Sequence, residues 1–188
     1  MRKTRHRRSR SLRLAAVPRP GPVGRAVRVL GLDPGSRVTG YGLIEVSGRS
    51  TCYLASGSIR VGDGELAGRL RHIYTHVAGL VAEHLPGGVA IERGFILSNT
   101  DSELKLGQAA YAALGAAAGG GAAVYEYAPR EVKLAVTGTG AADKGQVQHM
   151  VKALLGIEGR VGADAADALA IALCHAQHRG LALVVGSK

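Results

Sequence analysis

The chain has 188 residues and an apolar content normal for a globular protein, which is enough for one domain with a substantial core. Its formal net charge is +10, but ten of the 24 basic residues lie within residues 1–28, where there is no acid. The other 14 basic residues equal the 14 acids, so the body of the chain is not generally basic. Any polyanion must therefore bind the body through a local patch, a metal ion or a helix end.

Two lone cysteines, Cys52 and Cys174, lack the spacing of a zinc site and favour a reducing compartment, so a cytoplasmic protein is expected. No stretch of the sequence is apolar enough to span a membrane. Residues 1–26, rich in Arg, Ser and Pro, are expected to form a disordered basic tail. Three origins stay open for this tail: an arm that touches nucleic acid, a misassigned translation start, or an organelle transit peptide. The folded domain is expected over 27–179, with a short tail over 180–188.

The first predicted strand, Val29–Leu32, is a short apolar run typical of a strand buried on both faces. Pro34 and Gly35 end it, and Asp33 stands at the break. Ligands bind at the carboxyl ends of the strands in open α/β sheets, so Asp33 is a candidate site residue. Residues 37–45 predict a returning strand, which gives a hairpin with an acid at its mouth.

The rest of the chain alternates between helix and strand patterns. Strands are predicted over 51–60, 88–92 and 122–127, and helices over 66–81, 103–118, 129–136, 144–155 and 164–178. The helix over 103–118 is rich in small residues, so it is expected to pack closely against the sheet or against a twin helix in a dimer. This order predicts an α/β fold whose mixed sheet opens with a β-meander and is flanked by helices. It differs from a doubly wound dinucleotide fold and from a TIM barrel.

Four acids recur at ends of the predicted elements. Glu92 ends an apolar strand as Asp33 does, while Asp164 and Asp167 lie three residues apart on the inward face of the last helix. Carboxylates on an inward face cost several kcal/mol unless they are neutralised, and a divalent cation would neutralise them. Each acid alone also has an ordinary explanation, as a turn residue, a solvated strand end or a helix N-cap.

Lys144 begins an amphipathic helix behind the loop Gly138-Thr-Gly140. Backbone amides, the helix dipole and the ammonium could together bind a phosphate there. The spacing of a nucleoside-triphosphate-binding P-loop is absent from this stretch.

Five motifs over residues 28–178 resemble those of the RuvC Holliday-junction resolvases, a family of the ribonuclease-H-like superfamily. They are Gly31–Gly42, Ala90–Glu92, Asn99–Gln108, Lys144–Met150 and Ala163–Ala172. The resemblance implies a ribonuclease-H-like fold with a five-stranded mixed sheet, and a structure-selective endonuclease that resolves four-way DNA junctions in recombination and DNA repair. It implies a homodimer that makes paired symmetric nicks in the bacterial cytoplasm, with the RuvA and RuvB branch-migration proteins as partners.

The resemblance also assigns residues. It implies two Mg²⁺ ions, with Mn²⁺ as a substitute, held by Asp33, Glu92, Asp164 and Asp167. Lys144 becomes an active-site lysine that assists the scissile phosphate, and Lys133 and Phe95 become DNA-binding residues. Phe95, the only Phe of the chain, would stack on bases at the junction centre.

Alternatives stay open for these assignments. Lys133 could be a solvated helix charge and Phe95 a core residue, and we interpret His175 and His178 as surface or packing residues. At the level of function, the rivals are a ribonuclease-H-like nuclease on another nucleic acid and a junction-binding protein that does not cleave. An actin-like ATP-binding domain is disfavoured, because the chain is short and lacks the phosphate motifs of a second lobe.

Overall fold

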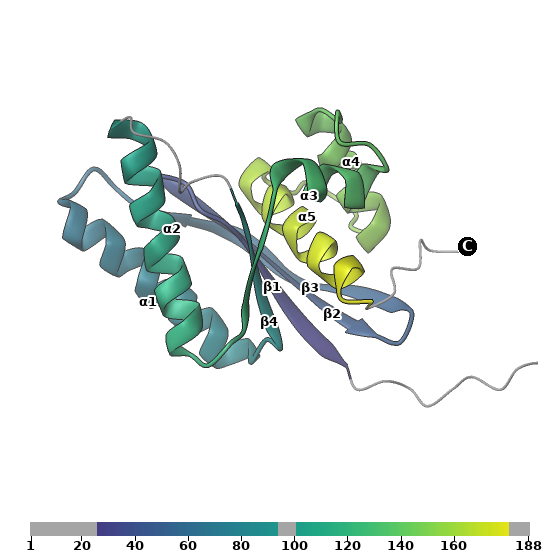
Figure 1. Ribbon diagram of the computed structural model, residues 1–188, viewed down its shortest axis with the longest axis horizontal. Coiled ribbons are helices and arrows are strands. Elements are labelled where there is room, and N and C mark those ends of the chain that lie inside the picture. The colour runs from purple at the N-terminus through teal and green to yellow at the C-terminus, as the bar shows by residue number, and fades with distance from the viewer. Residues whose placement is uncertain (1–25, 94–100, 181–188) are drawn as a thin grey trace, which may run out of the picture.

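The computed structural model describes residues 26–93 and 101–180, which form one sheet covered by helices on both faces (Figure 1). Helices α1 and α2 cover one face of the sheet, and α3, α4 and α5 lie on the other (Figure 1). The strands are β1 (Val27–Asp33), β2 (Val38–Ser47), β3 (Ser50–Arg60), β4 (Gly88–Glu92) and β5 (Val124–Tyr127). The helices are α1 (Leu66–His84), α2 (Asp101–Gly119), α3 (Pro129–Thr137), α4 (Lys144–Leu155) and α5 (Ala163–His178).

The sheet has five strands in the order β3-β2-β1-β4-β5. The first three strands form an antiparallel meander, while β4 and β5 run parallel to β1. The mixed sheet that opens with a meander is thus confirmed. Because β1 and β4 are parallel neighbours, their carboxyl ends meet at one edge of the sheet, with Leu32 opposite Ile91. We call this the carboxyl edge.

Two apolar cores flank the sheet. One core lies between the sheet and the two helices α1 and α2. The alanines of α2 at positions 109, 110, 113, 116 and 117 are buried in this core. The small-residue helix α2 therefore packs within the same chain, beside α1 and over Leu30 and Val89 of the sheet. Leu66, the first residue of α1, is 42% exposed and lies outside this core.

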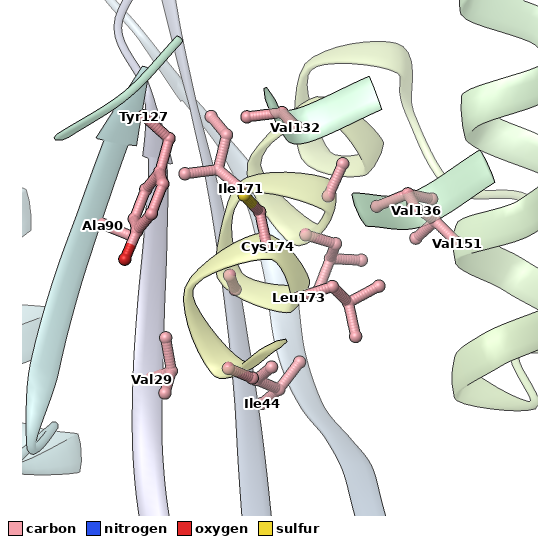
Figure 2. Close-up of a cluster of buried hydrophobic side chains, with 14 of the residues drawn as sticks. Val29, Ile44, Ala90, Tyr127, Val132, Val136, Val151, Ile171, Leu173 and Cys174 are labelled. Atoms are coloured by element: carbon pink, nitrogen blue, oxygen red, sulfur yellow. The ribbon is translucent and has the colours of Figure 1, made fainter. Parts of the chain in front are cut away.

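Helix α5 is the centre of the other core, between the sheet and the α3–α4 pair (Figure 2). Every residue from Ala168 to Ala176 is buried. A helix buried all round needs apolar or small residues on every side, which Ala168–Ala176 supplies. Within the described residues, no helix is long and apolar enough to cross a membrane.

A glycine seam, formed by Gly31 of β1 and Gly40 and Gly42 of β2, lets α5 approach the sheet closely. A Cβ at Gly42 would lie only 2.7 Å from the backbone nitrogen of Leu169. A Cβ at Gly31 or Gly40 would overlap the backbone carbonyls of Ala168 or Asp164. Because these glycines carry no side chain, the first turns of α5 rest on the sheet backbone beside the end of β1.

Candidate active site

Asp33 and Glu92 end the two neighbouring parallel strands at the carboxyl edge. Each follows a run of buried apolar residues, which fixes the backbone of the strand and leaves its last side chain half-buried at the rim. Both side chains line a cleft of about 270 Å³ between the sheet edge and the three helices on that face. This is the position at which open α/β sheets bind ligands.

Helix α5 brings its two acids to the same place. Asp164 lies in its first turn and Asp167 one turn later, and the glycine seam holds this part of the helix against β1 and β2. Asp167 lines the cleft, while Asp164 is absent from its lining. Asp164 lies beside it, with its backbone packed on Gly40, which pairs with Asp33 in the ladder.

The pKa values of Asp33 and Glu92 are both raised above their ordinary values. Burial raises the pKa of Asp33 from 3.8 to about 7, and the negative charges of Asp167, Glu92 and Asp164 add to the rise. Burial also raises the pKa of Glu92, again with help from Asp167. Lys144 opposes both increases. An excess of buried negative charge is therefore concentrated around Asp33.

Two lysines line the other wall of the cleft. Lys144 is the first residue of α4, whose N-cap Asp143 accepts a hydrogen bond from the backbone of Gln146 and fixes the start of the helix. The Lys144 ammonium lies 3.6 Å from the Asp167 carboxylate. Lys133 of α3 faces the cleft as well, and its charge lowers the pKa of Glu92. A phosphate entering the cleft would meet both ammonium groups.

The donor set suits a hard divalent cation. Its oxygens come from carboxylates, the ligands that Mg²⁺ and Mn²⁺ prefer, and the crowded charge around Asp33 calls for a positive partner. In the described part of the chain, however, no three His, Cys, Asp or Glu side chains converge closely enough to form a ready-made metal cage. Mutual repulsion of four carboxylates favours such separation, so side-chain rotation would accompany cation binding.

The structure thus brings together five of the predicted site residues in one cleft: Asp33, Glu92, Asp167, Lys133 and Lys144. Asp164 lies beside them, and Phe95 falls outside the described residues. Sequence reasoning missed the apolar part of the lining, which includes Val132 and Val147. The only sequence signal for these two valines is helical periodicity. Such periodicity predicts a buried face of the helix but does not predict that this face borders a cleft.

A second missed feature is a buried polar pair beneath the site. Tyr127, which is opposite Glu92 in the β4–β5 ladder, has its hydroxyl 2.8 Å from Nδ1 of His175 on α5. His175 is 3% exposed, and burial lowers its pKa from 6.5 to about 4, with the positive charges of Arg179 and His178 adding to the effect. His175 is thus a packing residue, and the neutral ring links β5 to α5, whereas His178 is exposed.

Comparison with known proteins gives consistent matches. The family model described as crossover junction endodeoxyribonuclease RuvC matches residues 29–175. A RuvC of this description from Marinobacter nauticus is 60% identical over 148 residues, covering 79% of this chain and 85% of that protein. One from Chromohalobacter salexigens is 53% identical, covering 83% of this chain and 84% of that protein. The structure of Thermus thermophilus RuvC in complex with a Holliday junction substrate is 33% identical, with a TM-score of 0.75 over 84% of this chain and 98% of that one.

Proposed function

Because the chain belongs to the RuvC family of crossover junction endodeoxyribonucleases, we propose that it resolves four-way DNA junctions in recombination and repair by hydrolysing phosphodiester bonds in the cleft around Asp33. The observation that carries the proposal is the meeting of Asp33, Glu92 and Asp167 with Lys144 and Lys133 in one cleft. Acids suited to a divalent cation face ammonium groups suited to a phosphate, which is what phosphodiester hydrolysis requires.

The acids would hold the cations, and the family's nucleases are metal-dependent. Asp33, Glu92, Asp164 and Asp167 would hold two Mg²⁺ ions, with Asp33 central among the four carboxylates. When bound, Mg²⁺, or Mn²⁺ in its place, supplies charge neutralisation at the phosphate and lowers the pKa of water.

The lysines would act on the DNA. The Lys144 ammonium, which lies 3.6 Å from the Asp167 carboxylate in the free protein, would donate to the scissile phosphate. Lys133, on the wall formed by α3, would contact a neighbouring phosphate. The apolar lining from Val132 and Val147 would limit water beside the reacting group. Phe95 would stack on a base at the junction centre.

A two-fold homodimer would place one cleft on each of two opposed strands, so paired symmetric nicks would follow. RuvA and RuvB would be the partners that move the junction to a cleavable position, in the bacterial cytoplasm. The relatives at 53–60% identity carry the RuvC name, which supports this assignment.

The test is cleavage of a labelled, mobile four-way junction with Mg²⁺ by the wild type and by Asp33→Asn. We expect paired nicks that Asp33→Asn abolishes while junction binding persists. Glu158→Gln, the same change from carboxylate to amide at an exposed acid away from the cleft, is the matched control and should cleave normally. Binding without cleavage in either Mg²⁺ or Mn²⁺ would favour a junction-binding protein. Equal cleavage of RNA–DNA hybrids or linear duplex would favour a ribonuclease-H-like nuclease on another substrate.

A further inference from the structure

A basic groove runs along α1 on the face of the sheet opposite to the cleft. It consists of two adjoining hollows of about 230 and 360 Å³ that share Gly68 and His72. Arg60 and Arg69 line the first hollow, and Arg71 and His76 line the second. We call these two hollows the α1 groove. None of its residues lines the cleft around Asp33.

The α1 groove opens at the carboxyl edge. Strand β3 runs parallel to β1, since both are antiparallel to β2, so Arg60 at the end of β3 lies at the same edge of the sheet as Asp33. Two strand spacings separate β3 from β1, or about 10 Å. A nucleic-acid strand spans this distance with a few nucleotides.

Hydrogen bonds tie the groove to the loop that follows Asp33. The backbone N–H of Val61 donates to the carbonyl of Arg37 over 2.9 Å, and the guanidinium of Arg69 donates to the carbonyl of Ser36. Nε of Arg69 is buried and has no acceptor among the described residues. The groove and the cleft therefore lie on opposite sides of the β1–β2 loop.

The groove has an excess of positive charge in a chain whose body is electrically balanced. Arg60, Arg69 and Arg71 contribute three positive charges, and Glu65 is the acid in the lining of the two hollows. Arg37 and Asp63 nearby form a pair of 3.5 Å, but they are 79% and 89% exposed, so this pair cancels within itself. Neither Arg60 nor Arg71 has an ion-pair partner within the described ranges 26–93 and 101–180.

The shape and donors of the groove suit a phosphate backbone. Gly62, Gly64 and Gly68 have no protein atom within 4 Å of a Cβ position, so a ligand backbone can approach the chain closely. Guanidinium forks bind phosphate oxygens in two-point contacts, and such contacts make up much of a protein–DNA interface. An elongated groove with arginines along it fits a run of phosphates better than one small anion.

We propose that the α1 groove binds the sugar–phosphate backbone of the DNA arm that leads away from the scissile phosphate. This proposal rests on the proposed junction-cleaving function and adds a second DNA-binding surface to it. Arg60 and Arg71 are the phosphate contacts, while Arg69 also positions the loop that follows Asp33. The arm passes over the start of β2, so DNA contacts both faces of the sheet at the carboxyl edge.

The test measures binding of a labelled four-way junction without divalent cation over a series of salt concentrations. The double variant Arg60→Ala/Arg71→Ala should bind about tenfold more weakly at low salt. The slope of log K against log salt should decrease in magnitude by about 1.8 if two phosphate contacts are lost. Arg49→Ala, in the exposed turn between β2 and β3 at the far end of the hairpin, is the matched control and should leave affinity and slope unchanged.

A second measurement separates a contact from a structural effect. Junctions that carry a single neutral methylphosphonate are scanned along the arms. The wild type should lose affinity at one or two phosphates a few nucleotides from the cut, and the double variant should be insensitive at those same phosphates. A uniform loss at every position, or equal affinity and slope for wild type and double variant, would overturn the proposal. Failure of the wild type itself to bind or cleave junctions would instead overturn the proposed function.

Discussion

The ammonium of Lys144 lies 3.6 Å from the carboxylate of Asp167, so a contact between α4 and α5 joins the two walls of the cleft. The lysine side chain is 87% exposed and the aspartate side chain 27% exposed, so this pair is weak as a contribution to stability. Its geometry instead places a positive charge beside the acids, where the ammonium can form a hydrogen bond with a phosphate.

Lys144→Met should therefore separate activity from stability. We expect the cleavage rate to fall about 100-fold or more, because a charged donor to the scissile phosphate is lost. The free energy of unfolding should change by less than about 1 kcal/mol, because the pair is exposed. Single-turnover cleavage and urea unfolding measure the two effects. Lys152→Met, in the last turn of the same helix, is the control and should change neither. A large loss of stability in Lys144→Met would show that the lysine holds the fold.

The effect of Asp33→Asn on the melting temperature should depend on Mg²⁺. At pH 8 and without divalent cations, the variant should melt about 4 °C or more above the wild type, because a buried charge among three like charges is removed. Added Mg²⁺ should raise the melting temperature of the wild type by mass action and leave that of Asp33→Asn nearly constant. Differential scanning calorimetry at constant ionic strength measures both. Equal shifts in the two proteins would contradict Asp33 as a cation ligand.

Gly42→Ala tests the glycine seam. The added methyl group would meet the backbone and side chain of Leu169 at 2.7 Å, so helix α5 must move away from the sheet. We expect destabilisation of about 3 kcal/mol or an unfolded protein. Gly62→Ala, the same change where no atom lies within 4 Å, should be neutral or stabilising by up to about 1 kcal/mol. Similar unfolding midpoints for the two variants in urea would show that the seam can relax.

His175 should make stability depend on pH. Its pKa is about 4 in the folded protein and near 6.5 in the unfolded chain, so between these values only the unfolded chain binds the proton. Stability should fall as the pH decreases from 6.5 to 4, by about 3 kcal/mol relative to His175→Gln. Urea unfolding of both proteins over this range gives the difference. If the free energy of unfolding varied with pH in the same way for both proteins, His175 would accept its proton at its ordinary pKa in the folded state.

The sequence made the ends of the strands predictable because their signals are local. Apolar runs broken by Pro34-Gly35, or ended by Glu92, mark where a strand stops and an acid begins. The spacing of Asp164 and Asp167 marks one face of a helix for the same reason. With parallel strands side by side, these rules suffice to bring the two strand acids to one edge, which the structure confirms for Asp33 and Glu92.

The features that were missed depend on contacts between residues far apart in the chain. Tyr127 and His175 are 48 residues apart, and Arg69 and Ser36 are 33 apart. No local pattern states which distant partner a polar side chain will find. The glycine seam did leave a signal, since Gly40 and Gly42 lie on one face of a strand, and glycine inside a strand often marks a close backbone approach.

Helix α5 has a consequence for the newly synthesised protein. Asp33 emerges from the ribosome early, with the strands that flank it, while α5 is the last of the described helices to emerge. The chain is made at about 5–20 residues per second, so the strands exist for several seconds before the helix can dock on the glycine seam. During that time Asp33 and Glu92 have neither Asp167 nor a closed cleft beside them. If Asp167 is needed for hydrolysis as proposed, we expect a nascent chain to cut DNA only once synthesis has delivered α5.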